Sequence, residues 1–132
     1  MKKLIPLLLA LLATSANAQQ SVFVPATTAQ IQIAGTVAGS TRIVQGIASK
    51  SIYVTSLALI PVTNSVVTFT SGTGTNCGTG TQNVTGVLTF TGGQTLSFGD
   101  GYGAVLVIPQ GADLCITIAT QPAPGSMSYA IF

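Results

Sequence analysis

Cysteine, aspartate and tyrosine are the few side chains in this sequence whose chemistry could support a site. The chain of 132 residues has two cysteines, two acidic residues and three tyrosines, and it has no histidine and no tryptophan. Catalysis normally needs a general base, an activated nucleophile or a metal ion, and the residues that supply them are scarce here. We therefore expect a protein that is not an enzyme, with no catalytic residues, no metal site and no cofactor.

Residues 70–86 read TSGTGTNCGTGTQNVTG, a run in which glycine and threonine surround a cysteine. A phosphate-binding loop requires a lysine after its glycines and a helix behind them, and a dinucleotide-binding loop requires a strand, a turn and a helix. This run contains no lysine, and no helical pattern follows it. A zinc site needs about four ligands from cysteine, histidine and acidic residues, which this chain does not provide. The run is therefore interpreted as structural.

Cys77, in the middle of that run, has one possible partner within the chain, Cys115. In a secreted protein, two cysteines indicate one disulfide. Alternation in ADLCITIAT places Leu114, Ile116 and Ile118 on one face of a strand and Cys115 on the other. If the isoleucines face the core, the disulfide holds the glycine-rich run against the outside of the sheet. Glycine suits such a run because its backbone must lie close to the strand.

Asp100 and Asp113 could in principle form a carboxylate pair of the kind that hydrolyses glycosides. Asp100 lies in FGDGYG, where aspartate beside glycine favours a tight turn, and Asp113 lies at the entry to a strand, so a turn role is the better interpretation for both. Tyr102 lies in the same loop as Asp100, outside any strand pattern. Asp100 and Tyr102 are therefore the candidate ligand contacts, for example with a cell-surface glycan.

The first residues have the features of a secretory signal peptide. Lys2 and Lys3 precede a short apolar run, and Ala16-Asn17-Ala18 has the small residues that signal peptidase requires. The apolar run has about half of the roughly 20 residues that a membrane-spanning helix needs. We expect residues 1–18 to be removed and the protein to be secreted, through the periplasm, to the cell surface or the medium, with no membrane association afterwards.

Cleavage after Ala18 would leave one arginine, one lysine and two aspartates, and therefore a net charge of zero. Without a basic patch, neither nucleic acid nor anionic lipid is expected as a partner. A nearly neutral surface also gives little electrostatic repulsion against self-association, so the expected partner is another copy of the same chain.

Strand patterns dominate the sequence after the signal peptide. Helix-forming residues are scarce, and short apolar or alternating runs are separated by glycine, proline and asparagine. We predict an all-β protein, a single antiparallel β-sandwich of the jelly-roll kind over residues 29–132, with about eight to ten short strands and one disulfide. The run at 103–109 is apolar throughout and is predicted to be a central strand. The expected strands are 29–37, 51–60, 65–72, 84–93, 94–98, 103–109, 112–120 and 126–132.

Residues 19–28, QQSVFVPATT, lie between the signal peptide and the predicted sandwich. Val22, Phe23 and Val24 are typical of a strand, and Pro25 follows them. The segment can be the first strand of its own sandwich or an N-terminal arm. As an arm freed by cleavage, it could add a strand to the open sheet edge of a neighbouring copy.

Four sequence features together resemble a loosely defined group of small disulfide-containing β-sandwich proteins found among uncharacterised bacterial surface proteins and phage virion proteins. The resemblance covers about the last three fifths of the chain, and its features are CGTGT around Cys77, GAVLVIPQG at 103–111, the pair Leu114-Cys115, and the ending from Tyr129 to Phe132. It implies a sandwich fold with a structural or attachment role and no catalytic residues. The signal peptide departs from virion proteins, which assemble in the cytoplasm, and favours a cellular surface or filament protein.

Two functions are consistent with these observations. The first is a secreted, non-enzymatic structural subunit that self-associates into an extracellular filament or surface layer. The second is a monomeric glycan- or surface-binding module, like an adhesin or a virion decoration protein.

Overall fold

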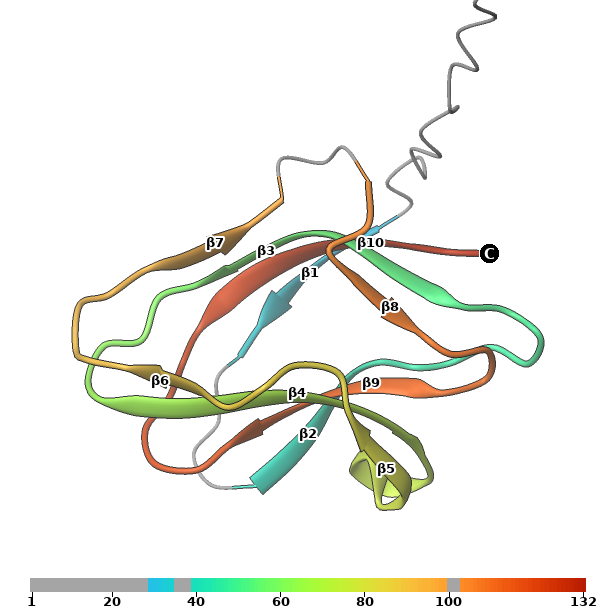
Figure 1. Ribbon diagram of the computed structural model, residues 1–132, viewed down its shortest axis with the longest axis horizontal. Helices are drawn as coiled ribbons and strands as arrows, with labels where there is room; N and C mark the ends of the chain where they lie inside the picture. Colours follow the sequence, from blue (N-terminus) through green and yellow to red (C-terminus); the bar gives the residue numbers. More distant parts are fainter. Residues whose placement is uncertain (1–28, 35–38, 100–102) are drawn as a thin grey trace, which may run out of the picture.

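The computed structural model describes residues 29–34, 39–99 and 103–132. The predicted signal peptide, the segment with Val22, Phe23 and Val24, and the candidate contacts Asp100 and Tyr102 lie outside these residues. The described part forms two antiparallel sheets around a shared core, with no α-helix among the described residues (Figure 1). The predicted antiparallel β-sandwich is therefore confirmed.

Its elements are β1 (Ala29–Ile33), β2 (Gly39–Val44), β3 (Ile52–Leu59), β4 (Ser65–Thr73), the short 3-10 helix η1 (Thr75–Cys77), β5 (Thr79–Asn83), β6 (Leu88–Phe90), β7 (Leu96–Phe98), β8 (Leu106–Ile108), β9 (Asp113–Ile118) and β10 (Gly125–Ile131).

The two sheets have matching layouts. In the first sheet the order is β1-β10-β3, and β7 and β8 pair one after the other along the far edge of β3. In the second sheet the order is β2-β9-β4, and β5 and β6 share the far edge of β4 in the same way. Each sheet thus has one continuous edge, formed by β1 or β2, and one edge divided between two short strands.

Alternate residues of the central strands fill the space between the sheets. Phe69 lies opposite Ile116 and Val67 opposite Ile118, and all four side chains are buried. Burying a large aliphatic or aromatic side chain contributes about 1.5–3 kcal/mol, so these paired rows supply much of the force that holds β4 and β9 together. The inward face predicted for Leu114, Ile116 and Ile118 is confirmed.

A bulge interrupts the alternation in β3. Val54 pairs with Tyr129 and Ser56 pairs with Ser128, which leaves Thr55 as an extra residue on β3. The Thr55 hydroxyl donates a hydrogen bond of 3.3 Å to the Ser128 carbonyl oxygen. The bulge explains why the run SIYVTSLALI does not alternate cleanly, although its strand is buried mainly on one face.

The prediction of a central strand at 103–109 is wrong. Only Leu106–Ile108 form a strand, β8, and among the described residues it pairs with β3 alone. Val107 is 54% exposed, while Ile108 is buried. A continuous apolar run is compatible with an edge strand as well as a central one, because hydrophobicity alone carries no information about how many neighbours a strand has.

Candidate functional site

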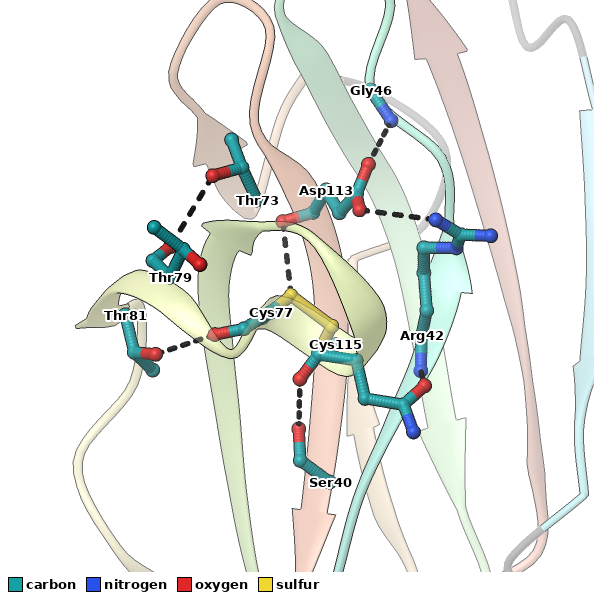
Figure 2. Close-up of a disulfide and its surroundings, with 10 residues drawn as sticks. Ser40, Arg42, Gly46, Thr73, Cys77, Thr79, Thr81, Asp113 and Cys115 are labelled. Atoms are coloured by element: carbon teal, nitrogen blue, oxygen red, sulfur yellow. Dashed lines mark hydrogen bonds and ion pairs between the residues drawn. A yellow bond between two sulfur atoms is a disulfide. The ribbon is translucent and has the colours of Figure 1, made fainter.

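The two predicted disulfide cysteines are bonded to each other. Cys77 in η1 and Cys115 in β9 form the disulfide, with their Cα atoms 6.2 Å apart (Figure 2). Cys115 lies between Arg42 of β2 and Thr70 of β4 in the register, on the face of the sheet that points away from the core. Both cysteines are completely buried. Residues 74–78, which we call the disulfide cap, include Cys77, and η1 within the cap contacts β2, β4 and β9 around Cys115. The predicted geometry, with the glycine-rich run held against the outside of the sheet, is confirmed.

Hydrogen bonds fix the disulfide cap to its surroundings. The amide oxygen of Asn76 accepts a 3.2 Å bond from the backbone N–H of Arg42, and the Ser40 hydroxyl donates a 2.9 Å bond to the Asn76 carbonyl oxygen. The Thr81 hydroxyl donates to the Cys77 carbonyl oxygen. Asn76 has a φ of 51°, in the left-handed region that asparagine tolerates better than most residues. The cap is thus attached to β2 and β5 as well as to β9.

Gly72 shows why the run beneath the cap needs glycine. A Cβ atom at this position would lie 2.9 Å from the Cys77 carbonyl oxygen and 3.0 Å from the Cys77 Cβ. Any larger residue would push the cap away from β4. The close approach that the sequence predicted for this run is therefore real at Gly72.

Asp113 connects β9 to the connection after β2. Its carboxylate accepts a 2.7 Å bond from the Gly46 N–H and forms a 3.3 Å ion pair with the Arg42 guanidinium (Figure 2). The Asp113 carbonyl oxygen also lies 3.6 Å from the Cys77 sulfur. That contact is packing, because a sulfur in a disulfide carries no hydrogen to donate. The turn role inferred for Asp113 missed these partners, which come from residues far away in the sequence.

This cluster has the properties of a structural site. The disulfide is buried, so no thiolate is available as a nucleophile, and the Asp113 carboxylate already has two partners. Across residues 29–34, 39–99 and 103–132, no three histidine, cysteine or acidic side chains come together to hold a metal ion. A buried disulfide is compatible with an oxidising environment outside the cytoplasm.

A second feature lies at the opposite end of the sandwich, on the outer face of the first sheet. An apolar hollow of about 410 Å³, which we call the end hollow, is lined by Gln32, Ala58, Ile60, Val62, Pro124, Gly125 and Ser126. Val62 is 72% exposed and Ile60 is 55% exposed, although both are aliphatic. The sequence does signal this feature, since the apolar run of β3 continues through Pro61 to Val62, past the end of the strand.

Next to the end hollow, the outer face of the first sheet is uncharged. Gln30 faces Ser128 and then Ser56 across three strands, and Gln32 faces Ser126 in the neighbouring row. A second hollow of about 380 Å³ lies over these residues. The face therefore offers hydroxyl and amide groups without a charge.

Comparisons of this chain with protein-family models, with curated proteins and with solved structures found no match. In the part of the chain that the structure describes, no helix has the length and apolar character needed to cross a membrane.

Proposed function

We propose that this protein is a secreted, non-enzymatic structural subunit that associates with copies of itself in an extracellular filament or surface layer. The observation that carries the proposal is the free edge of β1, together with the uncharged face beside it. Among the described residues β1 pairs only with β10, and its sequence, AQIQI, contains no charge.

Edge strands expose unpaired N–H and C=O groups that can pair with another chain, and soluble monomers usually guard them with charged residues. The described part of this chain has only three charged residues, Arg42, Lys50 and Asp113. Arg42 and Asp113 form an ion pair with each other. Lys50 lies in the connection between β2 and β3, where its carbonyl oxygen accepts a hydrogen bond from the Gly111 N–H, and it is not a residue of β1. The edge and the face beside it are thus open to contact with a second uncharged surface.

Electron microscopy and sedimentation of the purified mature protein test the proposal. We expect ordered polymers whose amount rises with protein concentration. Monomers that stay dispersed across the whole concentration range would contradict it.

A monomeric binding module is the second candidate, and the uncharged face favours it. Rows of glutamine and serine side chains over a hollow provide donors and acceptors for the hydroxyl groups of a glycan. Glycan-array binding by a protein that remains monomeric would support this alternative.

A further inference from the structure

The two ends of the sandwich carry different features. Ala29, the first residue of β1, pairs with Tyr129 near the end of β10, so the chain enters the sandwich at the end where its C-terminus lies. Ile33, at the other end of β1, pairs with Gly125, which lines the end hollow. In Figure 1 the C-terminus is on the right, and the connections from β3 to β4 and from β6 to β7 lie on the left. Ala29, where the preceding segment joins the sandwich, and the end hollow thus lie at opposite ends of β1.

We propose that Val22, Phe23 and Val24 of one copy dock in the end hollow of the next copy, an inference that rests on the proposed self-association. The segment from residue 19 to residue 28 joins directly to β1, and Val22 to Val24 lie five to seven residues before Ala29, which corresponds to a reach of up to about 17–25 Å in an extended chain. When copies stack with the same orientation, the start of β1 in one copy faces the end hollow of its neighbour. The segment therefore has the length and the attachment point that the contact requires.

The chemistry of the two surfaces agrees with this contact. Neither the end hollow nor the segment contains a charged side chain. Docking would therefore bury apolar surface on both sides and would not desolvate a charged side chain. Ile60 and Val62 are aliphatic side chains that are more than half exposed, and an apolar partner would cover them. Gln32 belongs both to β1 and to the end hollow, so a docked segment would lie beside the uncharged edge of β1.

The contact also determines the form of the assembly. A donor segment at one end and an acceptor hollow at the other make a head-to-tail contact, which produces open chains of subunits unless a rotation closes them into a ring. The competing occupant is the segment of the same chain. It would have to turn back at Ala29 and run along the five residues of β1, a distance of about 17 Å that an extended segment can cover, so the cross-links described below decide between the two occupants.

Cross-linking between separately purified mature proteins tests the contact. One protein carries Val24→Cys and the other carries Val62→Cys, and the two are mixed and oxidised. We expect a disulfide-linked dimer in the mixture at a yield at least several-fold above that of either protein alone. The matched control is Val87→Cys, because Val87 is also an exposed valine, at 67%, but lies before β6 on the other sheet. Equal yields with Val62→Cys and Val87→Cys would overturn the inference.

A second pair of variants separates this inference from the proposed function. Val62→Lys places a charge in the end hollow, where docking would have to desolvate it, whereas Val87→Lys places the same charge elsewhere. We expect Val62→Lys to abolish the polymers seen by electron microscopy and Val87→Lys to preserve them. Normal polymers of Val62→Lys would refute the docking contact and leave self-association intact.

If the unmodified protein forms no polymers, the proposed function fails, and cross-linking still decides the inference. Val24→Cys and Val62→Cys placed in one chain would then report which copy fills the end hollow. A link within one chain would show that the segment covers its own hollow and would overturn the inference, while a link between chains would support it.

Discussion

Thr70 shows how closely the disulfide cap covers the sheet. Its hydroxyl is buried, and within the described part of the chain it has no hydrogen-bond partner. Thr70 lies beside Cys115 in the register, so the disulfide cap that covers Cys115 also excludes solvent from the Thr70 hydroxyl. A buried hydroxyl without a partner costs free energy, because it loses its hydrogen bonds to water and gains none in return.

We expect Thr70→Val to stabilise the protein by about 1 kcal/mol, since valine has a similar shape and no hydroxyl to desolvate. Thermal denaturation measures the change as a rise in Tm of about 4 °C or more. The control is Thr68→Val on the same strand, where the side chain is partly exposed and the expected change is smaller. A lower Tm for Thr70→Val would mean that the hydroxyl has a partner, such as a buried water molecule.

Asp113 is the residue whose loss should disturb several elements at once. Asp113→Ala leaves the Gly46 N–H and the Arg42 guanidinium without their acceptor, so we expect a loss of about 1–3 kcal/mol in the free energy of unfolding. Urea denaturation measures this loss, and Lys50→Ala serves as the control for removing a charge. An unchanged denaturation midpoint for Asp113→Ala would show that neither contact stabilises the fold.

The sequence predicted the disulfide, but it predicted neither the buried, unpartnered hydroxyl of Thr70 nor the partners of Asp113. The disulfide could be predicted because the chain has two cysteines, so Cys115 is the only partner within the chain for Cys77. The partners of Asp113 are the backbone of Gly46 and the side chain of Arg42, which lie 67 and 71 residues away. A local pattern such as aspartate at a strand entry contains no information about contacts over that distance.

Among the elements, the disulfide cap depends most on a covalent bond. The disulfide joins residues 38 apart, and the chain-entropy treatment gives roughly 4 kcal/mol for closing a loop of that length. Three hydrogen bonds that involve side chains hold the cap, and it accepts all three: from the Ser40 hydroxyl, the Thr81 hydroxyl and the Arg42 backbone N–H. Because η1 is only three residues long, these bonds have little regular secondary structure to support them.

We expect Cys77→Ala with Cys115→Ala to lower the free energy of unfolding by about 2–5 kcal/mol. Hydrogen exchange should show the largest loss of protection in η1 and β5, and a smaller loss in β10, which lies in the other sheet. Asn76→Ala is the comparison, because it removes a side-chain acceptor from the cap and keeps the disulfide. Equal loss of protection across both sheets would indicate that the disulfide stabilises the whole fold evenly rather than the cap.

Alternation identified the inward face of β9 correctly, but the sequence predicted no strand at β2 or β5. Two further failures have physical reasons. In β3 the extra residue Thr55 shifts the pattern by one position, which a strict period of two does not anticipate. In β8 the apolar run gave no indication that the strand lies at an edge. The end hollow was also missed, although the exposed apolar residues Ile60 and Val62 continue directly from the β3 pattern.

At the scale of the whole molecule, the described strands from β1 to β10 form two sheets around one hydrophobic core. In the part of the chain that the structure describes, the largest fully buried side chains lie between residues 52 and 127.

Deleting Gln19 to Thr28, with the signal peptide joined directly to Ala29, should therefore leave a folded protein that does not polymerise. The fold is expected to survive because the core and the Cys77–Cys115 disulfide lie within the remaining chain. Assembly is expected to fail because the deletion removes Val22, Phe23 and Val24, the proposed donor, while leaving the end hollow in place. Circular dichroism and sedimentation measure the two outcomes separately.

The control for this deletion is a triple substitution of Val22, Phe23 and Val24 by serine, which keeps the length of the segment and removes its apolar side chains. We expect the triple variant to remain monomeric like the deletion, because the apolar contact, and not the chain length, stabilises the assembly. A deleted protein that polymerises as before would show that the segment is not the donor. A deleted protein that unfolds would show that residues 19–28 form a strand of their own sandwich. Removing a donor strand would not unfold the chain, whereas removing a strand of the native fold would.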